Sequence, residues 1–473
     1  MTITMGAPAP TKLAERFTAS ANATDSPVFS NEQFWQWFTE KRRRNGYVVR
    51  RIPFAEMSGW DFDPATGNLG HHSGRFFTVE GLQVRTDWQG GWSWAQPIIN
   101  QPEIGILGLV VKEFDGVLHC LMQAKMEPGN IDTIQLSPTV QATRSNYTGV
   151  HKGRPITHIE YFVSRRDSTV LADSLQSEHG TWFLRKRNRN MIVEVTDEVP
   201  EHDDFCWLTI GQVHQLLKKD NVVNMDTRSV LSCLPFGAAG YRTDGSAFRS
   251  ALRNSLSHDQ PARHTTTELL SWLTEIKARH ELDQRSVPLS SVDRWYRDDN
   301  EIAHEDGKHF TIIATEVAAA EREVSQWTQP LLAPTEQGVV GFLARPIDGV
   351  LHLLAHARAE AGGRDIVELA PTVQCLPGNY RDEEPGRRPR YLDLIQNAVG
   401  QHVYYDSVQS EEGGRFYHAD SRYRVVEAPD GFPLETPDEY RWITVHQATD
   451  LLQHSNYFNV QARSLIAGLH SGA

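Results

Sequence analysis

The sequence predicts an α+β protein built as a tandem duplication of one mixed-sheet domain flanked by helices. Three observations support this fold class: short motifs recur after a constant shift, each copy opens and closes with helical patterns, and the middle of each copy reads as strands. The 473 residues have an apolar fraction of 39% and include 12 Trp, which is ample for packed cores in about two to four domains.

The duplication is visible as nearly identical segments. Pro138-Thr139-Val140-Gln141 recurs as Pro371-Thr372-Val373-Gln374, a shift of 233 residues (371 − 138). At the same shift, DSLQSE at 173–178 returns as DSVQSE at 406–411, and near both ends the shift becomes 235 (459 − 224). Small loop insertions explain the change, so both copies descend from one ancestral domain.

The repeat divides the chain into four parts. Residues 1–29 are predicted to be a flexible N-terminal arm, 30–234 the first repeat and 265–473 the second repeat. The segment 235–264, which is rich in Gly, Ser and Arg, is predicted to be the linker between them.

A helix is predicted at the start of each repeat. Ser30 and Gln33 have the spacing of a capping box, and an apolar face of Phe34, Trp37 and Phe38 follows. Gly46 supplies a stop. The second repeat begins in a similar way near Thr267.

The middle of each repeat is predicted to contain a central β-hairpin. The runs 106–126 and 339–360 are each interrupted by an Asp-Gly pair, at 115–116 and 348–349, which suits a two-residue turn. Two short helices close the repeat, one at about 211–218 and one after Asp226. Together these elements predict a mixed sheet flanked by helices.

Charge and composition restrict the partners. The net charge of −13 argues against broad binding to nucleic acid or to an anionic membrane. The sequence has neither an apolar signal region nor a run of about 18 apolar residues. Its four cysteines are far apart and form no C-x-x-C pair, so we expect buried thiols and a cytoplasmic protein.

The richest polar cluster follows the first hairpin. Strand alternation predicts that Gln123, Lys125 and Glu127 share one face and project toward one cavity. A surface ion pair is the alternative interpretation. The matching positions in the second repeat are His356, Arg358 and Glu360.

The loop after this cluster differs between the repeats. Thr143-Arg144-Ser145 in the first repeat corresponds to Leu376-Pro377-Gly378 in the second, so hydrogen-bonding capacity is lost there. This difference predicts a fully equipped site in the first repeat and a degenerate one in the second. Free drift of a surface loop is the competing explanation.

Several residues near this loop could bind a nucleotide. Arg144 and His151 could contact phosphate oxygens, with Thr143 and Ser145 as neutral donors. Trp60 and Trp295 stand in polar segments where an indole could stack on a base, although packing in the core explains most tryptophans.

No familiar cofactor signature is present. The sequence lacks a G-x-G-x-x-G loop in a βαβ unit, a Walker A loop, a G-x-S-x-G elbow and an H-E-x-x-H helix. Nothing in it requires a nicotinamide, a metal or an acyl-enzyme, and we expect no cofactor.

The run QAKMEPGN at 123–130, followed by QLSPTVQATRSNY at 135–147, resembles the NDP-hexose 2,3-dehydratases of deoxysugar pathways in antibiotic-producing bacteria. The resemblance covers nearly the full length, including the duplication. It implies a fold similar to that of Nudix hydrolases, a homodimer, and two nucleotide-sugar pockets per subunit, one of them catalytic. The Nudix box itself is missing, so pyrophosphate hydrolysis is not expected.

The resemblance also implies a reaction. The enzyme would remove water across C2 and C3 of dTDP-4-keto-6-deoxyglucose and give a 3,4-diketo-2,6-dideoxyhexose, which an NADPH-dependent 3-ketoreductase would consume. The alternatives are a noncatalytic nucleotide-sugar-binding protein and a divergent Nudix-type hydrolase.

Site residues follow from both lines of reasoning. The candidate catalytic residues are Lys125, Glu127 and Tyr147. The candidate substrate-binding residues are Trp60, Thr143, Arg144, Ser145, Asn146, Tyr147, His151, Trp295, Arg358, Gln374 and Asn379.

Overall fold

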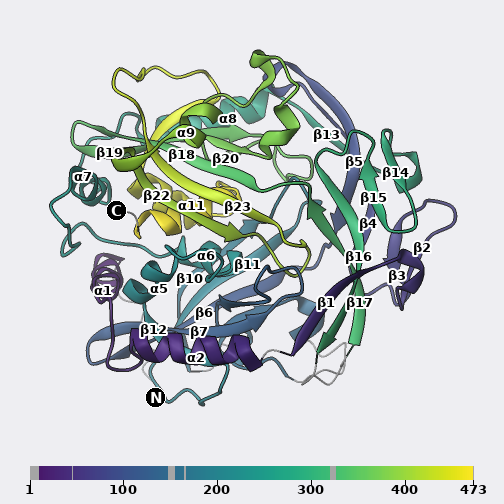
Figure 1. Cartoon of the computed structure of the whole chain (residues 1–473). Coiled ribbons are helices and arrows are strands. Elements are labelled where there is room, and N and C mark those ends of the chain that lie inside the picture. The colour runs from purple at the N-terminus through teal and green to yellow at the C-terminus, as the bar shows by residue number, and fades with distance from the viewer. Residues whose placement is uncertain (1–9, 45, 148–154, 165–166, 320–325, 472–473) are drawn as a thin grey trace.

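The computed structural model describes residues 10–44, 46–147, 155–164, 167–319 and 326–471. Both repeats contain a seven-stranded mixed sheet and a five-stranded antiparallel sheet (Figure 1). The α+β prediction and the tandem duplication are confirmed.

The seven-stranded sheets have the same topology in both repeats. In the first repeat the order is β10-β11-β6-β7-β12, with β8 on β7 and β9 on β6, and β11 runs parallel to β6. Its strands are β6 (Gly105–Phe114), β7 (Val117–Met126), β8 (Ile134–Ser137), β9 (Val140–Ala142), β10 (Ser168–Ser177), β11 (Arg187–Val195) and β12 (Phe205–Thr209). The second repeat uses β18 (Gly338–Ile347), β19 (Val350–Arg358), β20 (Glu368–Ala370), β21 (Val373–Cys375), β22 (Val403–Ser410), β23 (Asp420–Glu427) and β24 (Tyr440–Thr444).

The five-stranded sheets exchange one strand between the repeats. The first repeat contributes β2 (Trp60–Phe62), β3 (Leu69–His71), β4 (Thr78–Thr86) and β5 (Trp92–Asn100), and the second contributes β14 (Trp295–Arg297), β15 (Glu301–His304), β16 (Phe310–Ala319) and β17 (Gln326–Pro334). However, β1 (Tyr47–Ile52) pairs with β16 of the second repeat, and β13 (Leu282–Val287) pairs with β4 of the first. Figure 1 shows the purple β1 beside the green β16 and β17. Each repeat therefore completes a sheet of the other.

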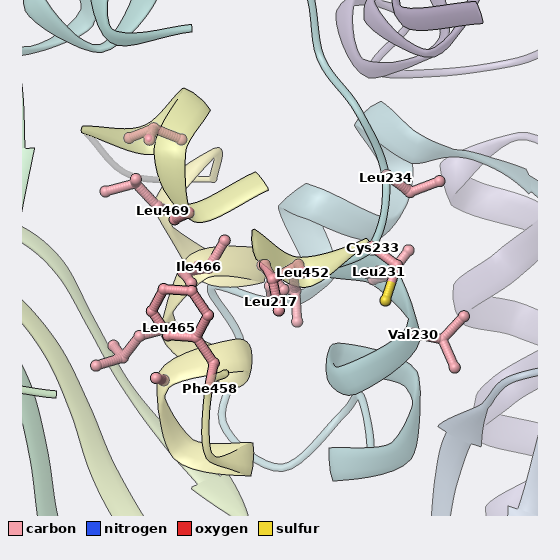
Figure 2. Close-up of a cluster of buried hydrophobic side chains, with 14 of the residues drawn as sticks. Leu217, Val230, Leu231, Cys233, Leu234, Leu452, Phe458, Leu465, Ile466 and Leu469 are labelled. Carbon is pink, nitrogen blue, oxygen red and sulfur yellow. The ribbon is translucent and has the colours of Figure 1, made fainter. Parts of the chain in front are cut away.

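Helices cover the seven-stranded sheets and meet between the repeats. They are α1 (Pro10–Asn22), α2 (Asn31–Arg44), α3 (Arg144–Tyr147), α4 (Glu160–Val163), α5 (Ile210–Leu216), α6 (Met225–Leu231), α7 (Ala247–Ser255), α8 (Thr266–Arg279), α9 (Leu392–Asn397), α10 (Val445–Leu452) and α11 (Val460–Leu469). Figure 2 shows Val230 and Leu231 of α6 in one apolar cluster with Leu465 and Ile466 of α11. One continuous core thus joins the two repeats. No helix in the described part of the chain is long and apolar enough to span a membrane.

The local predictions hold at the start of each repeat. Gln33 and Ser30 form the reciprocal bonds of a capping box, with the Ser30 N–H donating to Gln33 Oε1 at 2.8 Å. Thr265 and Glu268 do the same at the start of α8. The two predicted hairpins are β6–β7 and β18–β19.

The predicted flexible arm needs correction. Residues 10–22 form α1, in which Phe17 is fully buried and Leu13 is 8% exposed. Ser20 donates to the Leu118 carbonyl at 2.5 Å and fixes α1 against β7. The segment 235–264 also contains a packed element, since α7 buries Phe248 and Leu252 against β19.

Candidate active site

A cavity of about 280 Å³ lies at the junction of the two repeats. Its walls come mainly from the first repeat, at the ends of β6 and β7, from β9 and from the start of α6. The 411–416 loop of the second repeat closes the remaining side. The charged and amide side chains in its lining are Gln101, Lys125, Glu127, Gln141, Glu178, Lys186, Asn188, Asp226, Gln329, Glu412 and Arg415.

The loop from the second repeat reaches the cavity through a close backbone contact. The Gly129 N–H donates to the Gly413 carbonyl, and the His418 N–H donates to the Gly129 carbonyl, both at 2.7 Å. A Cβ at Gly129 would lie 1.7 Å from the Phe416 carbonyl oxygen, so only glycine permits this approach. The contact holds Glu412 and Arg415 in a cavity of the other repeat.

A chain of amide side chains orients Glu127. Asn224 caps the start of α6 and donates through Nδ2 to Gln141 Oε1 at 2.9 Å. Gln141 in turn donates to Glu127 Oε1 at 2.6 Å, and Lys125 Nζ donates to the Gln141 carbonyl at 2.8 Å. Glu127 and Lys125 are thus fixed beside each other at one wall of the cavity.

Two further carboxyl groups of the cavity have a raised pKa. Asp226 is 4% exposed, and burial, together with the nearby Glu178 and Glu127, raises its pKa well above the usual value. Burial also raises the pKa of Glu412 to about 7, although Arg415 works against this shift. The site therefore contains carboxyl groups that can carry protons near neutral pH.

Cationic side chains line the same space. Arg415 donates to Gln101 Oε1 at 3.0 Å, and its guanidinium lies 4.4 Å from the centre of the Phe77 ring. Lys186 donates to the Glu103 carbonyl. Burial lowers the pKa of both Arg415 and Lys186. These groups give the cavity positive charge that an anionic ligand could pair with.

The second repeat retains the amide chain. Asn459 donates to Gln374 at 2.7 Å, and Gln374 donates to Glu360 at 2.9 Å. Thr181 from the first repeat also donates to Glu360 at 3.1 Å. The amide chain that leads to this second glutamate is therefore the same as the chain that leads to Glu127, whereas the bond from Thr181 has no counterpart, because Gly414 stands at that position in the first cavity.

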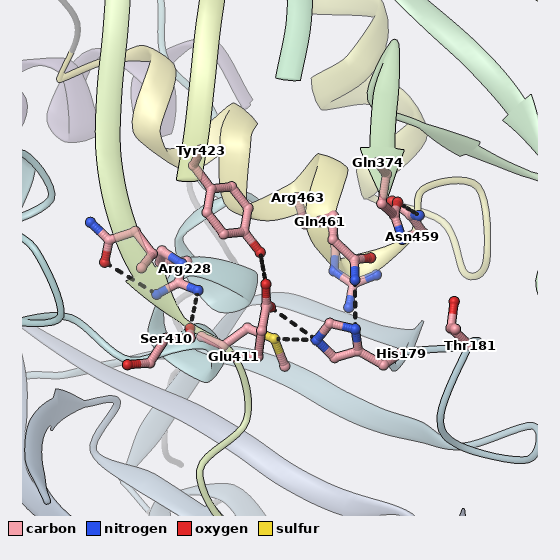
Figure 3. Close-up of polar contacts among 12 residues, drawn as sticks. His179, Thr181, Arg228, Gln374, Ser410, Glu411, Tyr423, Asn459, Gln461 and Arg463 are labelled. Atoms are coloured by element: carbon pink, nitrogen blue, oxygen red, sulfur yellow. Dashed lines mark hydrogen bonds and ion pairs between the residues drawn. The ribbon is translucent and has the colours of Figure 1, made fainter. Parts of the chain in front are cut away.

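Four other charged positions are altered in the second repeat, whereas Glu178 is retained as Glu411. By the repeat shift, Trp182 corresponds to Arg415, His179 to Glu412, Ala419 to Lys186 and Gln461 to Asp226. Trp182 is 8% exposed and stacks on His179 with ring centres 5.1 Å apart. Figure 3 shows His179 between Glu411 and Gln461, bonded to both. An aromatic residue and a closed hydrogen-bond network thus occupy the place of the first repeat's charged groups.

The structure brings some of the predicted residues to the cavity. Lys125, Glu127 and Thr143 line it, as does Gln141. Gln123 does not, because its Oε1 faces Ser137 at 3.5 Å.

Arg144 and Ser145, which follow Thr143 in the chain, do not line the cavity. Arg144 is exposed at the start of α3, and Ser145 donates to Glu103 at 2.8 Å. The structure does not describe the side chains of Asn146 and Tyr147, and His151 lies outside the described residues. The roles predicted for these last three residues stay predictions.

The two tryptophans predicted to stack on a base lie elsewhere. Trp60 is 6% exposed, packs against Phe77 and donates to the Thr328 carbonyl at 3.0 Å. Trp295 packs on Phe310 with ring centres 4.8 Å apart. Neither lines the cavity, and packing in the five-stranded sheets explains both.

The predicted residues of the second repeat surround Glu360 or lie beyond it. Arg358 is 3.7 Å from Glu360, and Gln374 bonds to Glu360 directly. Asn379 accepts a hydrogen bond from the His309 N–H at 2.9 Å.

Sequence reasoning missed the residues that the fold brings in from a distance. These are Glu178, Lys186, Asp226, Glu412 and Arg415. A signal was present, because SEHGTW at 177–182 corresponds to SEEGGR at 410–415, which changes charge inside a segment that is otherwise retained.

Comparison with known proteins identifies both repeats. A family model described as NDP-hexose 2,3-dehydratase matches residues 31–234 and again residues 266–469. A dTDP-4-dehydro-6-deoxy-α-D-glucopyranose 2,3-dehydratase of Saccharopolyspora spinosa is 51% identical over 98% of this chain and 96% of its own length. Relatives with the same description occur in Amycolatopsis orientalis (47% identical, over 97% of this chain and 94% of the relative) and Streptomyces violaceoruber (49%, over 92% and 96%).

Proposed function

The chain belongs to the NDP-hexose 2,3-dehydratase family, and we propose that its reaction takes place in the cavity of the first repeat. It is a hydro-lyase that removes water across C2 and C3 of dTDP-4-keto-6-deoxyglucose, the activity for which three relatives of nearly full length are named. The observation that supports this location is the contrast between the two repeats. Charged groups line the cavity beside Glu127, whereas in the second repeat Thr181 donates to Glu360 and Trp182 stands at the position that corresponds to Arg415. The names of the relatives favour dehydration over the noncatalytic and hydrolytic alternatives.

The substrate itself makes the chemistry accessible. The C4 carbonyl acidifies the proton on C3, and the enolate that forms can expel the hydroxyl group from C2. This elimination transfers no electrons to or from a cofactor. A base must take the C3 proton, a donor must stabilise the C4 oxygen, and an acid must protonate the departing hydroxyl.

We assign the base role to Glu127 and the donor role to Lys125. The amide chain from Asn224 through Gln141 holds the Glu127 carboxyl at the cavity wall, and Lys125 projects beside it. Arg415 and Lys186 supply positive charge for the diphosphate. Tyr147 remains a candidate for a supporting role.

The product determines the biological setting that we propose. The enol formed by dehydration tautomerises to a 3,4-diketo sugar, which is reactive and calls for prompt reduction by an NADPH-dependent 3-ketoreductase in deoxysugar biosynthesis for an antibiotic. We further propose a cytoplasmic homodimer whose repeats are related to the Nudix fold. The unpaired cysteines of the described chain are compatible with a reducing compartment.

Matched variants of the two repeats test the location. The purified protein is incubated with dTDP-4-keto-6-deoxyglucose, a 3-ketoreductase and NADPH, and the 2-deoxy sugar is followed by mass spectrometry. Glu127→Gln is expected to lower kcat by roughly 10² to 10⁴, the usual contribution of a positioned base. Glu360→Gln, the equivalent change in the second repeat, should leave kcat within about threefold of the wild-type value, because small effects are expected where no chemistry occurs. The reverse pattern would assign catalysis to the second repeat.

A further inference from the structure

Two carboxyl groups that face the cavity come from different repeats. Asp226 stands in the first turn of α6, and Glu412 stands in the loop that crosses from the second repeat. Neither carboxyl accepts a hydrogen bond from a residue that the structure describes. Burying a carboxyl group without a partner is costly, so a 4% exposed Asp226 aimed into a cavity indicates either a bound ligand or a shared proton.

The second repeat shows how these two positions are arranged. Gln461 occupies on α11 the place of Asp226 on α6, and His179 occupies the place of Glu412. These counterparts are bonded directly, with Gln461 Nε2 and His179 Nδ1 2.5 Å apart (Figure 3). In the first repeat, Asp226 and Glu412 line the same cavity, and the charge of Glu412 helps to raise the pKa of Asp226, after burial and the charges of Glu178 and Glu127. The shared cavity and the bonded counterparts in the second repeat are the observations that pair these two carboxyl groups.

We propose that Asp226 and Glu412 share one proton across the repeat boundary, and that this proton is donated to the C2 hydroxyl as it leaves. The inference rests on the proposed function, because it requires the C2 hydroxyl of the substrate in the first cavity. Two adjacent carboxylates do not both ionise readily, so such a pair retains a proton at neutral pH. The raised pKa values of both groups agree with this.

The proton balance of the step is complete. Glu127 takes the proton from C3, and the electrons of the C3–H bond form the enolate. When the C4 carbonyl re-forms, these electrons make the C2–C3 double bond, the C2–O bond breaks, and the departing oxygen takes the shared proton to become water. The proton on Glu127 then returns to the pair through solvent, and the enol loses a proton from its C3 hydroxyl and gains one at C2.

The test separates loss of the leaving group from removal of the C3 proton. Asp226→Asn, Glu412→Gln and the double variant D226Q/E412H are compared with the wild type, and the double variant recreates the pair found in the second repeat. Each is assayed for dehydration, for exchange of the C3 proton with deuterium from solvent, and for fluoride release from the 2-deoxy-2-fluoro analogue. Fluoride departs as a weakly basic anion and needs far less proton donation than hydroxide does.

We expect dehydration to fall by roughly 100-fold or more in all three variants, the scale of general acid catalysis. Fluoride release and C3 exchange should stay within about tenfold of the wild type, because they need the base rather than the acid. Wild-type dehydration rates in the variants would overturn the proposal. Equal loss of all three activities would overturn it as well and would make these residues supports of Glu127 or of substrate binding. A wild-type protein that neither dehydrates the substrate nor releases fluoride would instead overturn the proposed function. Gln461→Asn serves as the matched control.

Discussion

At the scale of single residues, Glu368 and Gln135 occupy the same position in the two repeats. Gln135 donates to Ser410 at 2.6 Å, whereas Glu368 accepts from Ser177 at 2.5 Å. Glu368 is 7% exposed, and burial raises its pKa from 4.5 to about 7. One of two equivalent positions at the repeat boundary therefore titrates near neutral pH.

This position predicts a pH-dependent difference in stability. The folded protein holds a proton on Glu368 that the unfolded chain releases above pH 4.5, so rising pH destabilises the fold until Glu368 ionises near pH 7. Glu368→Gln should remove this loss. Between pH 4 and pH 8, the free energy of unfolding of the variant should therefore rise by up to about 3 kcal/mol relative to that of the wild type. Urea unfolding at both pH values measures the effect, and Gln135→Glu should introduce the same loss. Parallel pH profiles for wild type and Glu368→Gln would contradict it.

The candidate site could be predicted only where it is local in sequence. Lys125 and Glu127 were identified because strand alternation places them on one side and both repeats keep a cation and a carboxylate there. Asp226 and Glu412 were not, because the first lies in a separate helix and the second reaches the cavity only through the contact at Gly129. No local pattern specifies such a tertiary contact.

At the scale of elements, the crossing loops depend on two equivalent glycines. A Cβ at Gly129 would lie 1.7 Å from the Phe416 carbonyl, and a Cβ at Gly362 would lie 2.0 Å from the Phe183 carbonyl. The Gly362 N–H donates to the Gly180 carbonyl, as the Gly129 N–H does to Gly413. Each glycine thus makes a close backbone contact with the loop that crosses from the other repeat.

Alanine at these two positions should have the same effect on stability and different effects on activity. Gly129→Ala and Gly362→Ala should each lower the free energy of unfolding by roughly 1–3 kcal/mol, because backbone must shift to admit the methyl group. Gly129→Ala should lower kcat more than about tenfold and more than Gly362→Ala does, because it displaces both Glu412 and Arg415, whereas the loop at Gly362 carries only Glu178 of the first cavity. Chemical denaturation and steady-state kinetics give the two values. An equal loss of kcat in both variants would show that the loops act through stability alone.

The elements themselves were predicted well where their signals are short-range. The capping box at Ser30 and the turn at Asp115-Gly116 are set by neighbouring residues, so the sequence is sufficient to indicate them. The pairing of β1 with β16 could not be predicted, because alternation along a strand is the same whichever sheet receives it. The N-terminal helix was missed because Leu13 and Phe17 find their partners far along the chain.

At the scale of the whole molecule, the two repeats form one interlocked unit. β1 and β13 are exchanged, and one apolar core includes α6 and α11 (Figure 2). Unfolding one repeat would remove a strand from a sheet of the other and expose this core. The repeats should therefore not unfold separately.

Calorimetry tests this cooperativity. We expect a single thermal transition whose van't Hoff and calorimetric enthalpies agree, in spite of the length of the chain. Ile52→Ala in β1 removes a side chain that is 7% exposed and belongs to the core of the exchanged sheets. It should lower the free energy of unfolding of the whole molecule by about 2–5 kcal/mol. The entire transition should therefore move to lower temperature. Two resolved transitions, or a shift in only one of them, would show that the repeats are independent.

The crossing of the 411–416 loop into the first cavity also limits how such enzymes can be recombined. A chimera with its crossover between the repeats would draw Lys125, Glu127 and Asp226 from one parent and Glu412 and Arg415 from the other. The parents would then have to be compatible in the proposed active site as well as along the shared core. A crossover inside the 235–264 segment, the boundary that the repeat itself suggests, would therefore divide the residues of the proposed site between two parents.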